Sequence, residues 1–580
     1  MSKARPGQPA AVPPGGVALL LALLGVSSAL QAQSLSPQQL RQIDQQINIS
    51  RDRVPASGLR SPSLELRILT PEQSSIPRAV DELEFELSQI QVDGATYFSK
   101  PELEAVFAPL LGRKVALPAL REAARALENK YRERGFFLAR VFVPPQQLKA
   151  GVFRVQVIEG HIARVLIDSA QAAIGERVEA MSRVLVNLRP LSLASLERVL
   201  LLINDLPGVS ATAVLRPGAE FGTSELLLSI APAAPVHLGT FSNTGSQTIG
   251  PYALNYNSTF QHLMGGTGQL NLNLTATGAG ANQLKGIRSA ALRYAQAIGA
   301  SGLILTLGGT QSKSRPGGSL TSLNLLSESS SLSSKLHYPL LRSRTNSLFL
   351  DAGLTVNSTN TTMSGAVLTS DRATAGDLAL IWSLNGWLSG VQTLTLGVAR
   401  GMDLFGAIDR NAPNPSSAGF EPRFTKTTLS LQRTQELAPQ FSLRLSVNTQ
   451  HSRDRLLAGE HIAFGGPALG RGFAPGAIAG DRGRGGMLEL RYDFKLKASP
   501  QIGNLQAYAS TDSASTRSVA VPALGIDSTR AHLNSEAIGL RLSLGRNTQL
   551  DLRYADGHQN LHADDPRRNR RLLIEATLVF

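Results

Sequence analysis

The sequence LELRYDFKLK, residues 488–497, alternates apolar and charged side chains without interruption. One face of this segment carries Leu488, Leu490, Tyr492, Phe494 and Leu496, and the other carries Glu489, Arg491, Asp493, Lys495 and Lys497. Successive side chains of a strand point to opposite sides, so the pattern predicts a strand with one apolar and one charged face. The charged face is compatible with bulk water or with a wet lumen. Strands of about ten residues with this alternation are typical of transmembrane β-barrels.

The same texture extends from about residue 237 to the C-terminus and predicts a barrel of about sixteen antiparallel strands over 235–580. QLNLNLTA at 269–276 and QLDLRYA at 549–555 repeat the pattern most clearly. We expect strands to start near residues 237, 251, 268, 287, 302, 331, 346, 376, 391, 424, 440, 487, 503, 535, 548 and 571.

The connections between these strands alternate in length, which gives the barrel a direction in the membrane. Long connections follow the odd-numbered strands, at 313–330, 358–375, 402–423, 451–486, 514–534 and 556–570, and short ones follow the even-numbered strands. Outer-membrane barrels have long external loops and tight periplasmic turns. The alternation therefore predicts that the first strand starts in the periplasm, and an even strand number returns the C-terminus there. A soluble all-β domain is the alternative interpretation of this region.

The N-terminus predicts export. Lys3 and Arg5 precede an apolar run over 17–26 and small residues at 27–29, which together are typical of a secretory signal peptide over 1–32. Residues 33–50 follow as a short helix, with Ser36 as the N-cap and Pro37 in its first turn, and this helix is either a plain terminal helix or a plug for the lumen. A linker is expected over 51–82.

Composition excludes several classes of function. The chain has no Cys, so it has no disulfides and no thiolate metal ligands or nucleophiles. The formal net charge of +14 comes from dispersed basic residues and aromatic residues make up only 5%, so we expect no nucleic-acid partner. The nine His are scattered and neither an HExxH nor a GxSxG motif occurs, so we expect no enzyme, cofactor or metal.

Residues 83–160 and 161–234 predict two copies of one α+β module. Each copy reads strand, helix, helix, strand, strand, with turn signals between the elements. The order resembles the POTRA domain, a periplasmic polypeptide-binding module. GFFLARVFVPPQQLKAGVFRVQVIEGHI, residues 135–162, closely resembles the first POTRA domain of two-partner secretion transporters. The matching positions are Gly135, Phe136, Pro144, Gln146, Gly151, Glu159 and Gly160.

The glycine-rich segment 465–486 lies in the longest predicted external loop, where no βαβ unit or Lys-Ser/Thr pair supports phosphate binding. It resembles the sixth-loop motif of the POTRA–barrel superfamily, whose loop folds into the barrel so that its arginine meets an acidic residue of the inner wall. Arg471, Gly472 and Phe473 match the core of that motif, and Gly470 replaces its usual Val. The resemblance assigns the acidic partner to Asp512. The alternative is a solvated external loop.

Over nearly the whole mature chain the sequence resembles the TpsB transporters of two-partner secretion, the haemolysin secretion/activation proteins. This resemblance implies an outer-membrane translocator that binds an unfolded TpsA-like exoprotein through its POTRA domains and exports it. The partner would be a haemolysin, an adhesin or a haem-acquisition protein. Other implied partners are outer-membrane lipid and, during biogenesis, periplasmic chaperones and the barrel-assembly machinery, for which Phe580 resembles the C-terminal signal. A barrel-assembly factor and a diffusion porin or receptor remain as alternatives.

Overall fold

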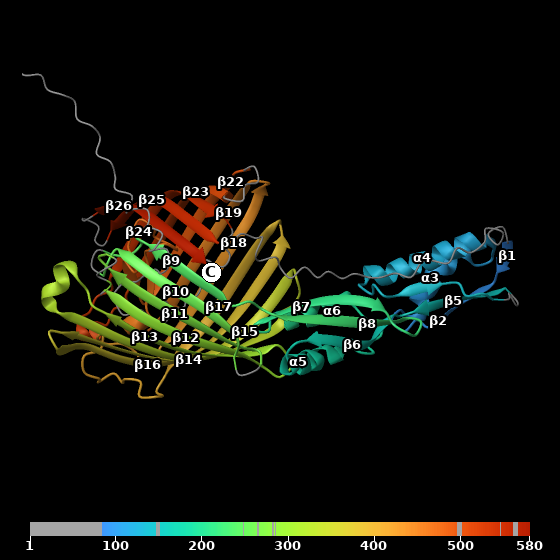
Figure 1. Ribbon diagram of the computed structural model, residues 1–580, viewed down its shortest axis with the longest axis horizontal. Helices are drawn as coiled ribbons and strands as arrows, with labels where there is room; N and C mark the ends of the chain where they lie inside the picture. Colours follow the sequence, from blue (N-terminus) through green and yellow to red (C-terminus); the bar gives the residue numbers. More distant parts are fainter. Residues whose placement is uncertain are drawn as a thin grey trace, which may run out of the picture.

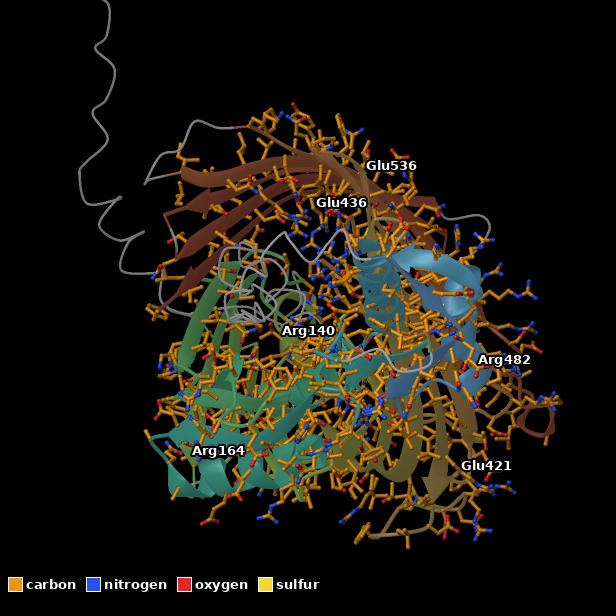
Figure 2. The ribbon with its side chains drawn as sticks, turned by 90° about the vertical axis from the view of Figure 1, so that its right-hand side faces the viewer. Arg140, Arg164, Glu421, Glu436, Arg482 and Glu536 are labelled. Carbon is orange, nitrogen blue, oxygen red and sulfur yellow. The ribbon has the colours of Figure 1, made fainter. Side chains whose placement is uncertain are left out.

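The structure is a computed structural model that describes residues 84–580 except 147–150, 247–248, 264–265, 281–283, 285, 496–501, 546 and 561–565. The predicted signal peptide, N-terminal helix and linker (1–32, 33–50 and 51–82) lie outside the described residues. Two small modules extend end to end from one mouth of a large barrel (Figure 1). Figure 2, seen from the module end, shows Arg140 and Arg164 on these modules in front of the barrel.

The first module packs helices on a small sheet. Its elements are β1 (Glu84–Leu87), β2 (Gln89–Asp93), α3 (Lys100–Phe107), β3 (Arg113–Ala116), α4 (Leu117–Glu133), β4 (Arg140–Phe142) and β5 (Val152–Ile158). β5 lies between β2, which runs parallel to it, and β4, which runs antiparallel. Helix α4 buries a stripe of Leu120, Ala124, Leu127 and Tyr131 against this sheet.

The β4 strand is shorter than the sequence predicts. The stretch from Phe136 to Ala139 forms a turn instead, in which Phe136 N–H donates to Tyr131 C=O at 2.9 Å and Ala139 N–H to Phe136 C=O at 3.2 Å. Phe136 packs in the core beside α4, whereas Phe137 and Leu138 pack against the core of the second module, so the bulky apolar side chains of this turn reflect core packing rather than strand pairing.

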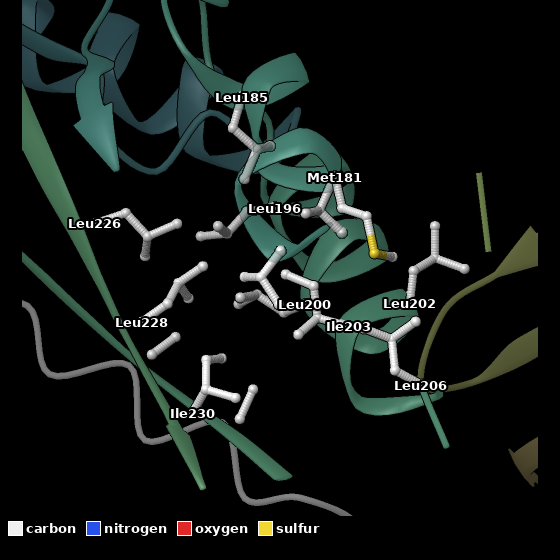
Figure 3. Packing of buried hydrophobic residues seen from close by; sticks show 14 of the residues in the cluster. Met181, Leu185, Leu196, Leu200, Leu202, Ile203, Leu206, Leu226, Leu228 and Ile230 are labelled. Carbon is white, nitrogen blue, oxygen red and sulfur yellow. The ribbon is translucent and has the colours of Figure 1, made fainter. Parts of the chain in front are cut away.

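The second module repeats the order strand, helix, helix, strand, strand. It consists of β6 (His161–Ser169), α5 (Ala172–Ser182), α6 (Leu193–Asn204), β7 (Val209–Pro217) and β8 (Thr223–Pro232), with β8 between β6 and β7. Ser192 caps α6 by accepting the N–H of Ser195 at 3.1 Å. Figure 3 shows leucines of α6 meeting Leu226, Leu228 and Ile230 of β8 in the core.

The barrel confirms the predicted fold class, with sixteen antiparallel strands in one closed sheet. They are β9 (Val236–Ser242), β10 (Tyr252–Leu263), β11 (Gly268–Gly278), β12 (Ile287–Ile298), β13 (Leu303–Ser314), β14 (Leu325–Arg342), β15 (Asn346–Met363), β16 (Ala366–Trp387), β17 (Gly390–Met402), β18 (Thr425–Ala438), β19 (Phe441–Ser452), β22 (Arg482–Asp493), β23 (Ile502–Arg517), β24 (Arg530–Leu544), β25 (Thr548–Asn560) and β26 (Pro566–Val579). The last strand, β26, pairs with the first, β9.

Most strand starts agree with prediction, but several strands extend further on the external side. β14, β16, β22, β24 and β26 start five to ten residues earlier than predicted, and the predicted loop 358–375 is almost wholly strand because β15 and β16 are joined by 364–365 alone. The added segments of β14 and β15 are rich in Ser, Thr and Asn, whereas those of β22 and β26 are rich in Arg. Beyond the lipid neither face of a hairpin has to be apolar, so pairing continues where the alternation stops.

The side chains of β22 test the alternation directly. Leu488 and Leu490 are 41% and 44% exposed on the lipid side, whereas Glu489 is fully buried on the lumen side. The strand ends at Asp493 rather than at 497. Among the described residues, no helix is both long and apolar enough to cross a bilayer.

The second module is joined to the periplasmic turns of the barrel by ion pairs. Arg342, at the end of β14, contacts both carboxylate oxygens of Asp205, with Nε–Oδ2 at 2.6 Å and Nη2–Oδ1 at 2.8 Å. In the next turn Arg344 lies 3.4 Å from the carboxylate of Glu197. These contacts fix α6 against the β14–β15 turn.

Candidate functional site: the loop inside the barrel

The segment between β19 and β22 turns into the barrel and forms a small core there. It contains a short antiparallel pair, β20 (Ile462–Phe464) and β21 (Ile478–Gly480). Apolar side chains of the segment pack against the inner wall, in a cluster of Ile462, Phe464, Leu469, Phe473, Ile478, Met487, Ala514 and Leu533. Apolar burial, about 25 cal/mol per Å², thus contributes to the position of the loop inside the barrel.

Glycines allow the loop tip to approach the wall closely. A Cβ added at Gly472 would lie 2.6 Å from the Cα of Gly557 on β25, and a Cβ at Gly557 would lie 2.7 Å from the ring of Phe473. Gly470 has φ +85°, where a β-branched residue is strained. This conformation explains why the chain has Gly at the position where the related motif has Val.

The Arg471 side chain is buried and contacts three groups. Its Nη2 lies 2.6 Å from Oε2 of Glu489, Nη1 donates to the Ser510 hydroxyl at 2.7 Å, and Nε donates to the Pro467 carbonyl at 3.3 Å. Arg471 is 2% exposed and Glu489 fully buried. A guanidinium removed from water needs such paired acceptors, and a carboxylate supplies the strongest of them.

The carboxylate that pairs with this guanidinium is therefore that of Glu489 and not the expected Asp512. In the β22–β23 register Glu489 lies opposite Ser510 and Met487 lies opposite Asp512, so the arginine reaches the pair of positions beside Asp512. Asp512 holds the loop backbone instead, because its Oδ1 accepts the Gly470 N–H at 2.6 Å and the Ser535 hydroxyl at 2.6 Å. Both carboxylates thus contact the loop: Glu489 binds the side chain of Arg471, and Asp512 binds the backbone N–H of Gly470.

Glu489 is the centre of a larger set of buried charges. Arg541 contacts its two oxygens at 2.9 and 3.0 Å, and Arg491 contacts Oε1 at 2.7 Å. Arg541 also reaches Asp551 at 3.1 Å, and Asp551 pairs with Arg553 at 3.2 Å. Arg541, Asp551 and Arg553 thus extend the charge contacts of Glu489 across the neighbouring strands β24 and β25.

The sequence pattern does not distinguish Glu489 as a functional residue, although it lies in the most regular strand pattern. The alternation places it on the charged face of that strand, and only the register with β23 shows that it lies beside the loop. Arg541, Asp551 and Arg553 have no motif of their own. Their common signal is a charged residue facing inward on an otherwise apolar–polar strand.

A second set of contacts holds the loop nearer its external end. Asp481, fully buried, accepts the N–H of Leu456 at 2.7 Å and of Val519 at 2.6 Å. Lys426 on β18 and Glu460 form a buried ion pair at 2.5 Å. The loop is therefore tied to strand β18 on one side and to the β23–β24 connection on the other.

The predicted motif of the first module is a structural set. The carboxylate of Glu159 accepts the backbone N–H groups of Thr96 and Tyr97 at 2.8 and 2.9 Å and the Tyr131 hydroxyl at 2.7 Å. Burial by itself raises the pKa of Glu159, but the hydrogen bonds from Thr96 and Tyr131 outweigh it and hold this pKa below its usual range. Burial and the adjacent carboxylate raise the pKa of Tyr131.

The prolines and Gln146 end the β4 strand. Continuing the β4–β5 register would place Pro144 opposite Arg154, where a proline has no N–H to donate. The side chain of Gln146 takes the place of the missing backbone partner of Arg154. Its Oε1 accepts the Arg154 N–H at 2.8 Å, and its Nε2 donates to the Arg154 C=O at 2.8 Å. The carboxamide thus acts as a backbone peptide group at the edge of the sheet.

The remaining motif residues make close backbone approaches or fill the core. Gly135 and Gly151 have φ of +86° and +68°, and a Cβ at Gly160 would lie 2.6 Å from the Leu138 carbonyl oxygen. Phe136 is buried beside Tyr97 at a ring distance of 4.4 Å. Phe580 follows β26, and its N–H donates to the His237 carbonyl at 2.9 Å beside the β26–β9 junction.

This architecture defines a β-barrel of the outer membrane with POTRA modules on its periplasmic side. Residues 222–541 match the haemolysin secretion/activation proteins ShlB/FhaC/HecB, and residues 85–160 match the ShlB-type POTRA domain. The chain belongs to the ShlB/FhaC/HecB family, which consists of two-partner secretion transporters. It is therefore an outer-membrane transporter with POTRA domains in the periplasm.

Individual relatives are distant but match over most of their length. The chain is 24% identical to the heme/hemopexin transporter protein HuxB of Haemophilus influenzae strain 86-028NP, over 69% of this chain and 71% of that protein. It is 23% identical to the outer membrane transporter CdiB of Dickeya dadantii, over 86% and 88%. The solved structure of CdiB from Escherichia coli matches with a TM-score of 0.71 and 21% identity, over 95% of this chain and all of that one.

Proposed function

We propose that this protein captures an unfolded secreted exoprotein in the periplasm through its POTRA domains and passes it outward through the barrel. Family membership supports the translocator role, and the relatives of this chain include a heme/hemopexin transporter protein and a hemolysin transporter protein. The partner of this chain would accordingly be a large TpsA-like exoprotein of the haemolysin, adhesin or haem-acquisition kind.

Sheet edges of the POTRA domains support capture by strand addition. β2 and β4 are the outer strands of the first sheet, and β6 and β7 are those of the second. An edge strand presents unpaired N–H and C=O groups to which an extended peptide adds. Because β4 has only three residues and β2 has five, the β2 edge of the first domain is the longer acceptor.

The observation that carries the proposal is the loop held by Arg471 and Glu489 inside a barrel of sixteen strands. A loop fixed by a buried ion pair narrows the lumen but also provides a defined element that an incoming chain displaces or passes. In the working state Arg471, Glu489 and the backbone contact of Asp512 hold this loop in place.

The experiment is to measure release into the medium of a candidate TpsA-like exoprotein expressed together with this protein. Cells carry the intact protein, lack it, or carry Arg471→Ala, and the amount of folded barrel is compared in each. Release only with the intact protein supports a dedicated exporter. Release that does not depend on this protein would instead favour a barrel-assembly factor or a porin, and normal release by Arg471→Ala at equal abundance would refute the role of the loop.

A further inference from the structure

One stretch of the inner wall differs from the rest in chemistry. On β10 and β11 the lumen-facing positions carry the carboxamides Asn255, Asn257, Gln261, Gln269, Asn271 and Asn273, which we call the amide wall. Asn257 lies directly opposite Asn273, and Gln261 opposite Gln269. The opposite face of the same strands carries Leu270, Leu272 and Leu274, with Leu274 exposed to lipid.

The carboxamides form cross-strand hydrogen bonds and keep further capacity. Asn273 donates to Asn255 at 2.8 Å and Gln269 donates to Gln261 at 3.0 Å, while the Thr259 hydroxyl donates to Asn271 at 2.8 Å. Each carboxamide has two N–H donors and two acceptor lone pairs, so one bond leaves groups that face the lumen. The six carboxamides are partly exposed there.

The amide wall also carries no charge. Residues 252–263 and 268–278 contain no Asp, Glu, Lys or Arg. The wall formed by β22 to β25 is the contrast, because it holds Glu489, Arg541, Asp551 and Arg553 in ion pairs and is covered by the loop. Strands β26 and β9 separate the two walls.

The periplasmic end of the amide wall meets the second POTRA domain. A Cβ added at Gly208, one residue before β7, would lie 2.8 Å from Oε1 of Gln261. Only residues 233–235 separate the domain's central strand β8 from β9, the neighbour of β10 around the barrel. Gln261 therefore lies next to this domain at the periplasmic end of the wall.

We infer that the amide wall is the surface along which the extended exoprotein moves through the barrel. This inference rests on the proposed export function. Carboxamides reproduce the donor and acceptor of a peptide group, so they exchange hydrogen bonds with a passing backbone whatever its sequence. Such exchanges have a small net free energy, because bonds to water are replaced by similar bonds. Because the wall carries no charge, it does not hold back the acidic or basic side chains of the passing exoprotein.

The test uses the absence of Cys from the chain. Asn273→Cys places a single thiol on the amide wall, and Gln432→Cys on β18 is the matched control, since Gln432 faces the lumen opposite Ser446. An exoprotein with one Cys is stalled by a stable folded domain fused to its C-terminus, and disulfide cross-links are quantified. We expect several-fold more cross-linking at position 273 than at 432.

The outcomes of this experiment distinguish a failure of the amide wall as the path of the exoprotein from a failure of the proposed export function. Equal or greater cross-linking at 432 than at 273, or no cross-link between Asn273→Cys and an exoprotein that cross-links at 432, would overturn the path while export stands. If the unsubstituted protein releases no exoprotein, the proposed function and the path both fail.

A second variant tests the chemistry of the wall. Asn271→Lys should reduce release of the exoprotein several-fold at unchanged barrel abundance. Asn271→Gln, which keeps a carboxamide at this position, should release as much as the unsubstituted protein, and Gln432→Lys should have little effect. Equal loss for both lysine variants would show a general effect of lumen charge and overturn the inference.

Discussion

The buried charges around Arg471 predict an unexpected order among three variants. Removing one member of a buried ion pair typically costs about 3–5 kcal/mol. After Arg471→Ala, Glu489 still contacts Arg491 and Arg541, so the free energy that keeps the loop docked should fall by about 3 kcal/mol. After Glu489→Ala, three guanidiniums remain around the vacated position and repel one another. The free energy that keeps the loop docked should then fall by about 5 kcal/mol.

Asp512→Asn should be the mildest of the three. The amide oxygen still accepts hydrogen bonds from the Gly470 N–H and the Ser535 hydroxyl, so the free energy that keeps the loop docked should fall by about 1 kcal/mol. A difference of about 2 kcal/mol between the Glu489 and Arg471 variants corresponds to roughly 30-fold in the equilibrium between docked and released loop.

The assay is labelling of a single Ala474→Cys, in the loop, by a membrane-impermeant maleimide on intact cells. Labelling should rise from Asp512→Asn through Arg471→Ala to Glu489→Ala, and secretion should fall in the same order. Glu436→Ala, an exposed glutamate at the β18–β19 turn, is the control. The reasoning is refuted if Asp512→Asn labels as strongly as Arg471→Ala while Glu489→Ala resembles the unsubstituted protein.

Three further variants probe other contacts. Gly472→Val should release the loop, because even a Cβ meets Gly557 at 2.6 Å; the Ala474 label should then react faster, and an unchanged rate would contradict the close approach. Since the pKa of Glu159 is lower in the folded state, its contribution to the free energy of unfolding is complete above about pH 4.3 and is lost as pH falls through the folded pKa. Glu159→Gln should therefore raise hydrogen exchange of the Thr96 amide at pH 7 and reduce its change on acidification, whereas an unaltered pH profile would contradict the assignment. Asp205→Ala should broaden spin-label distances between the second POTRA domain and the barrel with the barrel's thermal stability unchanged, since this pair is partly exposed and contributes about 0–1 kcal/mol.

The sequence predicts the barrel well because lipid imposes a strict rule on each strand. Where one face must be apolar, a period of two is visible in a single chain, as at 488–497 and 269–276. The rule ends at the membrane boundary, so the external halves of β14 to β16 read as loops. Their pairing depends on the neighbouring strand, which a local pattern does not contain.

The same distinction separates Arg471 from its partner. The arginine lies in a recognisable motif, whereas the identity of its carboxylate depends on how β22 and β23 are aligned. A shift of two positions exchanges Asp512 for Ser510 and Met487 for Glu489 on the same face. Alternation gives the face of each residue but not its height in the barrel, so Glu489 could be placed on the inner wall but not beside the loop.

The length of the β15–β16 hairpin determines how far one side of the barrel wall stands above the lipid. At about 3.3 Å per residue its 22 residues span roughly 70 Å, or about 55 Å along the membrane normal at a tilt near 40°, against an apolar band of about 25 Å. The exposed Trp387 at the periplasmic end is typical of the aromatic girdle at that interface, so the surplus of roughly 30 Å stands outside. Under the proposed function, a chain leaving the barrel on that side would meet this wall before the lipid surface, which would reduce adsorption of its unfolded apolar segments.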